Sequence, residues 1–168
     1  MAWEKTAIGG QSCRQDSTMG CAFACIATVT YWLTNKQHDE SDIRNRLTGH
    51  STLWEPKNDA MTAGLNLGVA TALLSSLAIQ SETFEGLTKD AFQQKMKEAS
   101  PENPLLVGVT WLSNDKHLVV CAGPASNGKV WIFDPANGLA EHPIDPIFKQ
   151  GGTVGLFDLK AVRIIGNY

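Results

Sequence analysis

The pattern of apolar residues changes near residue 100, and this change sets the strongest limit on the fold. Residues 21–33, about 59–77 and 88–99 carry apolar side chains at helical spacings. Ser100-Pro101 and Asn103-Pro104 then break the helical pattern. The stretches 104–111, 117–123, 129–134 and 153–165 are short and rich in β-branched or aromatic residues, which is typical of strands. Helices followed by an antiparallel meander predict an α+β fold in which the helical half packs on the sheet.

The limits of the helices follow from capping residues and breakers. The first helix is expected to begin between residues 17 and 20, with Ser17 or Thr18 as its cap, and to run to about residue 33. A short helix at 41–48 has Ser41 as its expected cap and Gly49 as its stop. The segment 88–99 predicts a surface helix, and the turn residues 126–128 predict a hairpin.

Size and composition predict one globular domain over residues 1–168, which could be a piece of a longer effector or toxin chain. Hydrophobic residues make up 43% and charged residues 18%, and the net charge is −3. Basic residues are scattered, so we expect neither nucleic-acid nor membrane binding. No segment has the length of a transmembrane span, and the N-terminus lacks the features of a secretory signal. We therefore expect action in a cytosol, reached if necessary through a specialised secretion system.

Four cysteines raise the question of metal binding, disulfides or catalysis. Cys21 and Cys25 are four residues apart on one predicted helix, a poor geometry for a disulfide. No close pair of the kind found in structural zinc sites is present. We therefore expect reduced thiols, with Cys13 and Cys121 structural and no metal or organic cofactor.

Cys21 is the better candidate for a nucleophile. It lies at the predicted first turn of a helix, where the partial positive charge of the helix N-terminus favours a thiolate. Cys25 lies one turn deeper in an apolar stretch, where burial raises the pKa of a thiol and leaves it inert.

Three other residues could complete a catalytic site. Gln15, six residues before Cys21, could place a side-chain amide at an oxyanion, with the Cys21 N–H as the second donor. His117 opens a predicted strand and could act as the base. Asp134 ends the next strand, so a hairpin would bring it beside His117 to orient the ring.

These residues and their surroundings resemble papain-like cysteine peptidases. The resemblance rests on Gln15 and Cys21 at a spacing of six, on NPLLVGVTW leading to His117, and on VWIFDPANG around Asp134. It covers residues 11–138 and is strongest for the compact bacterial kind, which includes the peptidase domains of bacteriocin-processing exporters and avirulence-type effector proteases. It implies a nucleophile helix packed on an antiparallel sheet and peptide-bond cleavage through an acyl-enzyme. Carried over by position, Gln15 is the oxyanion donor, Cys21 the nucleophile, His117 the base and Asp134 the orienting residue.

The sequence also departs from the family and leaves rival residues. Ala22 follows the nucleophile where many relatives carry Gly or Ser, and Asp134 replaces the Asn of papain itself. Among rival bases, His142 has acidic neighbours, whereas His38 and His50 have no acid placed to orient them. Trp54, Trp111 and Asn137-Gly138 are candidates to line a substrate groove.

The sequence therefore predicts a cysteine protease that acts on a protein substrate, as a bacterial effector or toxin with an immunity or inhibitor protein as partner. A glutamine deamidase, a transglutaminase or a peptidoglycan amidase would use the same triad on a different amide. A catalytically inactive binding module would keep only the fold.

Overall fold

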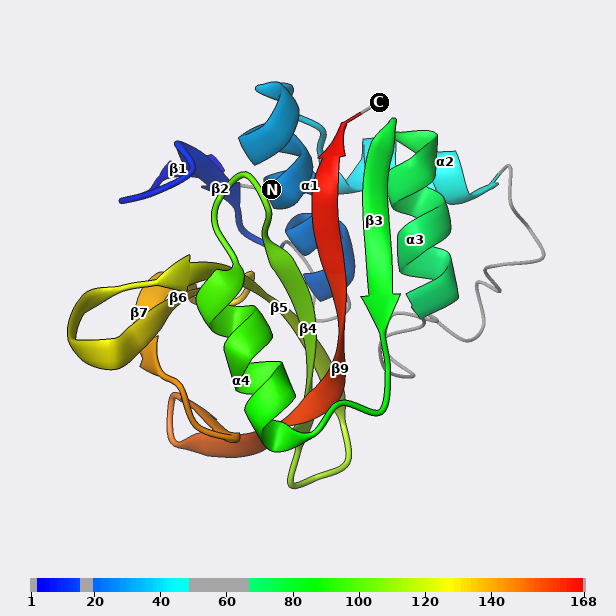
Figure 1. Cartoon of the computed structure of the whole chain (residues 1–168). Helices are drawn as coiled ribbons and strands as arrows, with labels where there is room; N and C mark the ends of the chain where they lie inside the picture. Colours follow the sequence, from blue (N-terminus) through cyan, green and yellow to red (C-terminus); the bar gives the residue numbers. More distant parts are fainter. Residues whose placement is uncertain (1–2, 16–19, 49–66, 168) are drawn as a thin grey trace.

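The computed structural model describes residues 3–15, 20–48 and 67–167 of the chain (Figure 1). A two-stranded sheet formed by β1 (Trp3–Lys5) and β2 (Gln11–Cys13) precedes the first helix. The helices are α1 (Cys21–Thr34), α2 (Glu40–Thr48), α3 (Leu67–Ser76) and α4 (Lys89–Glu98). The other strands are β3 (Ile79–Phe84), β4 (Leu105–Trp111), β5 (Lys116–Pro124), β6 (Lys129–Asp134), β7 (Gly138–Pro143), β8 (Ile147–Gln150) and β9 (Thr153–Asn167).

The main sheet is antiparallel with the order β3-β9-β4-β5-β6-β7, and β8 pairs with β9. Strands β4, β5 and β6 form the first three strands of the expected meander, and the 126–128 turn joins β5 to β6 as predicted. Strands β7 and β8, which follow β6 in the chain, were not predicted. The expectation of helices first and a simple meander afterwards is wrong in two places. Strand β3 lies between α3 and α4 in the chain, and β9 returns to pair with both β3 and β4. The α+β class is confirmed.

Two apolar cores cover the two faces of the sheet, because alternate strand residues point to opposite sides. On one face, Phe23 and Ile26 of α1 pack with Leu118 and Val120 of β5. On the other, Phe92 and Met96 of α4 pack with Val119. In Figure 1, α1 lies behind the sheet and α4 lies in front of it. The sheet is thus fixed from both sides, and α1 is buried all round from Cys21 to Thr30.

The helix ends match the sequence predictions in part. Gly20 is the N-cap residue of α1, whereas the expected caps, Ser17 and Thr18, lie outside the described residues. Ser41 is not the cap of α2, because the Asp39 carboxylate accepts the Asp42 N–H at 2.7 Å and so caps the helix two residues earlier. The predicted stop, Gly49, and the first part of the predicted helix at 59–77 also lie outside the described residues.

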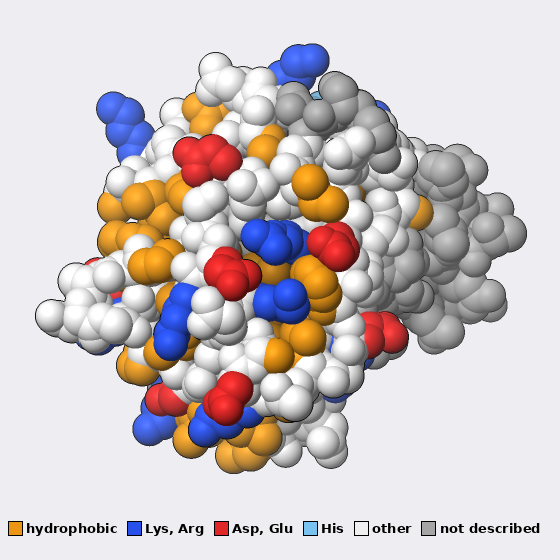
Figure 2. All heavy atoms as spheres, viewed as in Figure 1, with side chains coloured by type: hydrophobic (Ala, Val, Ile, Leu, Met, Phe, Trp, Pro, Cys, Tyr) orange, Lys and Arg blue, Asp and Glu red, His pale blue; other side chains and the backbone are white. Residues whose placement is uncertain are grey.

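The remaining helix and the surface follow the sequence more closely. Thr88 caps α4 by accepting the Ala91 N–H at 3.1 Å, and α4 buries its apolar side as expected. None of the helices in the described part of the chain combines the length and apolar character that a membrane span requires. On the face shown in Figure 2, basic and acidic side chains are interspersed with apolar ones.

Candidate active site

Cys21 is the first residue of α1, so its thiol lies at the positive end of a buried helix. Only 4% of the residue is exposed. The N-cap residue is Gly20, which has no side chain that could cap the helix. The partial positive charge of the helix N-terminus favours negative charge on the thiol.

His117 and Asp134 are brought together by the hairpin of β5 and β6. Val120 pairs with Phe133 in this hairpin. Continuing the register by one residue puts Asp134 opposite Val119, diagonal to His117 on the same face. The His117 Nε2 lies 2.8 Å from Asp134 Oδ1. The predicted approach of these two side chains is confirmed.

The charged form of the His117 ring is favoured by its partners. Burial by itself lowers the pKa of His117, but hydrogen bonds to Asp134 and to the Cys21 thiol, with the negative charge of both groups, raise it from 6.5 to about 9. Because Nε2 faces Asp134, the other ring nitrogen, Nδ1, is the one that faces Cys21. The imidazole thus lies between a thiol and a carboxylate, an arrangement suited to a thiolate and imidazolium pair.

Gln15 follows β2 and lies on the same cleft as His117. The cleft has a volume of about 390 Å³ and is lined by Gln15, Trp111, His117, Ala136, Asn137, Gln150, Gly151 and Thr153. The backbone N–H of Gln15 donates to the Pro135 carbonyl at 2.9 Å, which fixes this segment against the turn that follows Asp134. The structure therefore brings all four predicted residues to one place.

Cys25 has a structural setting. It is fully buried, and its Sγ–H donates to the Leu118 carbonyl at 3.3 Å. Burial raises the pKa of Cys25 well above its ordinary value, and electrostatic interactions with Cys21, Asp134 and Cys13 raise it further. Cys25 is thus a neutral thiol that ties α1 to β5 beside His117. Cys121 is equally buried on the other face of the sheet, and burial raises its pKa to about 12.

The rival histidines lie elsewhere. The His142 ring stacks on Phe148 with centroids 5.0 Å apart, and its Nδ1 lies 2.6 Å from the Pro143 carbonyl. The expectation that no acid orients His38 is wrong, because its Nδ1 contacts Asp42 one helical turn into α2. His38 borders a different cavity, beside Thr30 and Arg46. His50 lies outside the described residues, as does the groove candidate Trp54.

Two of the predicted groove residues, Trp111 and Asn137, line the cleft, whereas Gly138 does not. Trp111 also stacks on the His117 ring with centroids 5.6 Å apart, a contact that was not predicted. The turn from Gln150 to Thr153, between β8 and β9, forms another wall. Gly151-Gly152 predicts the turn itself, but the pairing of β9 with β4, which places Gly155 opposite Trp111, brings the turn to the cleft, and this distant pairing was not predicted. Among the described residues, no three His, Cys, Asp or Glu side chains form a group that could hold a metal ion.

Comparison with known proteins identifies the family. A family model described as the papain-like cysteine protease AvrRpt2 matches residues 5–145. The chain belongs to the AvrRpt2 family of papain-like cysteine proteases. It is therefore a hydrolase of the cysteine peptidase type, as the resemblance in the sequence predicted. No curated protein sequence matches the chain.

Two solved structures are similar to the chain at low sequence identity. A double-glycine-motif protease from an AMS/PCAT transporter, solved in complex with the leader peptide, is 17% identical, with a TM-score of 0.50. The match covers 94% of this chain and 98% of that one. The Pseudomonas avirulence protein AvrPphB is 12% identical, with a TM-score of 0.40 over 86% of this chain and 80% of that one. The first likeness supports a papain-like fold for this member of the AvrRpt2 family.

Proposed function

We propose that this protease hydrolyses peptide bonds of a protein substrate with Cys21 as nucleophile, His117 as general base and Asp134 as the residue that orients the base. The observation that carries the proposal is the distance of 2.8 Å between His117 Nε2 and the Asp134 carboxylate, together with the Cys21 thiol close enough to the same ring to help raise the pKa of His117. Gln15 and the backbone N–H of Cys21 are the proposed donors to the oxyanion.

The reaction follows from these positions. His117 takes the thiol proton, and the Cys21 sulfur attacks the carbonyl carbon of the scissile bond. The carbonyl oxygen becomes an oxyanion, which accepts hydrogen bonds from Gln15 and the helix N-terminus. The C–N bond then breaks, His117 gives its proton to the leaving amine, and a thioester remains on Cys21. Water attacks the thioester with His117 as base, which releases the new carboxyl terminus and restores the thiol.

The cleft beside His117 is where we place the leaving half of the substrate, because His117 must protonate the leaving amine. Its lining carries no formal charge apart from the His117 imidazolium. Trp111 offers an apolar wall, while Asn137, Gln150 and Thr153 offer amide and hydroxyl groups. We therefore infer that the residues just after the scissile bond are uncharged.

The setting that we propose is the cytosol of a target cell, entered by an effector or toxin through a specialised secretion system. The family carries the name of AvrRpt2, and a reducing compartment suits a nucleophilic thiol. All four cysteines lie within the described residues, and none of them forms a disulfide. A protease of this kind would require an immunity or inhibitor protein in the cell that makes it.

The test is to map new protein termini in a cell lysate treated with the wild-type protein or with Cys21→Ala. New N-termini that require Cys21 support proteolysis, and uncharged residues at those termini support the assignment of the cleft. A gain of 1 Da at glutamine residues, which deamidation produces, would show that the protein is a deamidase instead of a protease. Absence of any Cys21-dependent change, with no preferential alkylation of Cys21 by iodoacetamide, would make the chain an inactive binding module.

A further inference from the structure

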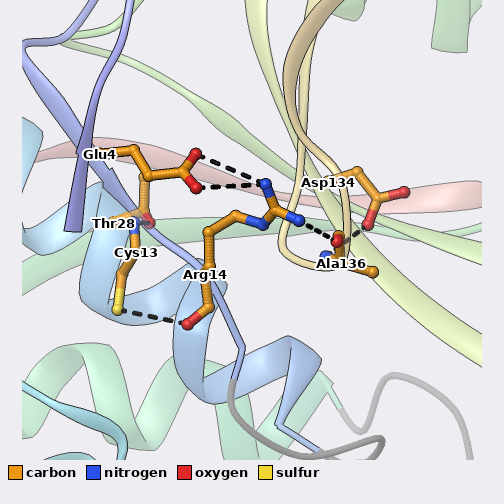
Figure 3. A network of polar contacts seen from close by, with 6 residues as sticks. All are labelled: Glu4, Cys13, Arg14, Thr28, Asp134 and Ala136. Atoms are coloured by element: carbon orange, nitrogen blue, oxygen red, sulfur yellow. Dashed lines mark hydrogen bonds and ion pairs between the residues drawn. The ribbon is translucent and has the colours of Figure 1, made fainter. Parts of the chain in front are cut away.

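Arg14 joins two parts of the chain that are far apart in sequence (Figure 3). Its Nη1 lies 3.3 Å and 3.5 Å from the two carboxylate oxygens of Glu4 in β1. Its Nη2 donates to the backbone carbonyl of Ala136, in the turn between β6 and β7. Arg14 thus bridges the two-stranded sheet at the N-terminus and the turn that follows Asp134.

The same turn carries the acid of the proposed triad. Asp134 Oδ1 accepts the Ala136 N–H at 2.9 Å as well as facing His117. The Arg14 guanidinium therefore binds the carbonyl of Ala136, while the N–H of the same residue binds the Asp134 carboxylate. A displacement of Ala136 would move a group that holds the acid in place.

Arg14 also immediately precedes Gln15. The Gln15 N–H donates to Pro135, the neighbour of Ala136 in the same turn. Two adjacent residues before the nucleophile helix thus bind two adjacent residues after Asp134. The bond between Gln15 and Pro135 involves backbone atoms only. The bond to Ala136 depends on the Arg14 side chain, so a substitution of Arg14 removes it.

We propose that Arg14 is a positioning residue that holds the segment of Gln15 against the turn of Asp134, so that the oxyanion donor and the His117–Asp134 pair keep their relative places. The inference rests on the proposed function, since it assumes the roles of these three residues. Glu4 holds the guanidinium from the other side, and Gly138 leaves room for it, because a Cβ there would lie 3.3 Å from Arg14 Nη1.

The guanidinium group is suited to this position. Its planar fork can bind Glu4 with one nitrogen and the Ala136 carbonyl with another at the same time. A lysine ammonium is a single point of charge and cannot span both partners in this way. The ion pair itself is partly exposed, with 30% of the Arg14 side chain and 44% of the Glu4 side chain accessible, so it adds little to overall stability.

The experiment measures the catalytic groups directly, because the substrate is unidentified. Wild type, Arg14→Met and Arg14→Lys are compared by the NMR titration of the His117 ring and by the rate at which iodoacetamide alkylates Cys21 at pH 7. Arg46→Met is the matched control, since Arg46 forms a partly exposed pair with Asp42 at 4.0 Å on α2, away from the cleft. Thermal unfolding of each variant reports whether it remains folded.

We expect Arg14→Met to lower the titration midpoint of His117 by about one pH unit, because the Asp134 carboxylate loses its fixed position. For the same reason, the rate at which Cys21 is alkylated should fall about tenfold. For Arg14→Lys, the titration midpoint and the alkylation rate should lie between those of Arg14→Met and wild type. For Arg46→Met, both should equal those of wild type. A midpoint and rate in both Arg14 variants that equal those of wild type would overturn the inference. If Arg14→Met alone unfolds, Arg14→Lys decides the outcome by the same two measurements. Failure of the proposed function would look different, because wild type itself would then show no preferential alkylation of Cys21.

Discussion

Removing the charge of Asp134 tests the electrostatics of the site most directly. In the folded protein, Asp134 and Cys21 outweigh the effect of burial and raise the pKa of His117 from 6.5 to about 9. Since one pKa unit corresponds to about 1.4 kcal/mol, the folded state favours the charged ring by about 3 kcal/mol relative to the unfolded state. Because this pKa is raised on folding, the stabilisation is complete below pH 6.5 and is lost as the pH rises through 9.

The variant Asp134→Asn keeps a hydrogen-bond acceptor of the same shape but has no charge. We expect the titration midpoint of His117 to fall by more than about one pH unit, because burial is then opposed by Cys21 alone. We also expect a loss of about 1–3 kcal/mol in the free energy of unfolding at pH 6, and a clearly smaller loss at pH 10, where His117 is neutral in both proteins.

Two measurements decide this prediction. The His117 ring protons are titrated by NMR, with the signal assigned by its absence in His117→Gln, and urea unfolding is followed at pH 6 and pH 10. Asp158→Asn is the control, because Asp158 is also largely buried on the sheet but accepts from Thr110 at 2.7 Å instead of contacting His117. A midpoint that stays near 9 in Asp134→Asn, or a destabilisation that is equal at both pH values, would refute the reasoning.

Three further predictions test separate parts of the site. Gln15→Ala should lower kcat on a peptide substrate by about 10²–10³ with little change in KM, and an unchanged kcat would remove Gln15 from the oxyanion site. Cys25→Ala and Cys121→Ala should each lower the free energy of unfolding in urea by about 1–2 kcal/mol, because each removes a buried thiol that donates to a backbone carbonyl. Only Cys25→Ala should slow the alkylation of Cys21, because the bond from Cys25 to Leu118 joins α1 to the strand that carries His117. Gln150→Arg should shift cleavage in a peptide library toward acidic residues after the scissile bond, and an unaltered profile would place the leaving half elsewhere.

The site could be predicted from the sequence because each of its residues lies at the boundary of a regular element. Cys21 begins a helix and Asp134 ends a strand, and both boundaries are set by local residue preferences. The hairpin signal at 126–128 was sufficient to bring Asp134 to His117, since one short turn fixes the register of two adjacent strands.

The parts that escaped prediction depend on contacts between distant segments. Most side chains of β3 are partly or fully exposed, and only Ile79 is fully buried. In the sequence, the polar residues of β3 therefore resemble a loop. The hydrogen bond from Arg14 to Ala136 joins residues that are 122 positions apart, and the sequence around each residue contains no pattern that indicates the other. The cap of α2 was misplaced by two residues because Asp39 and Ser41 are both good capping residues, and only the backbone geometry decides between them.

The position of β9 between β3 and β4 has a consequence for the order of assembly during synthesis. The residues of the proposed triad and strands β4 to β7 precede residue 153, yet β3 and β4 have no common neighbour until 153–167 have emerged from the ribosome. A nascent chain shorter than this exposes one edge of β4 and one edge of β3, which are surfaces prone to pair with other chains. The whole sheet that positions the proposed catalytic residues is therefore complete only after residues 153–167 have been made.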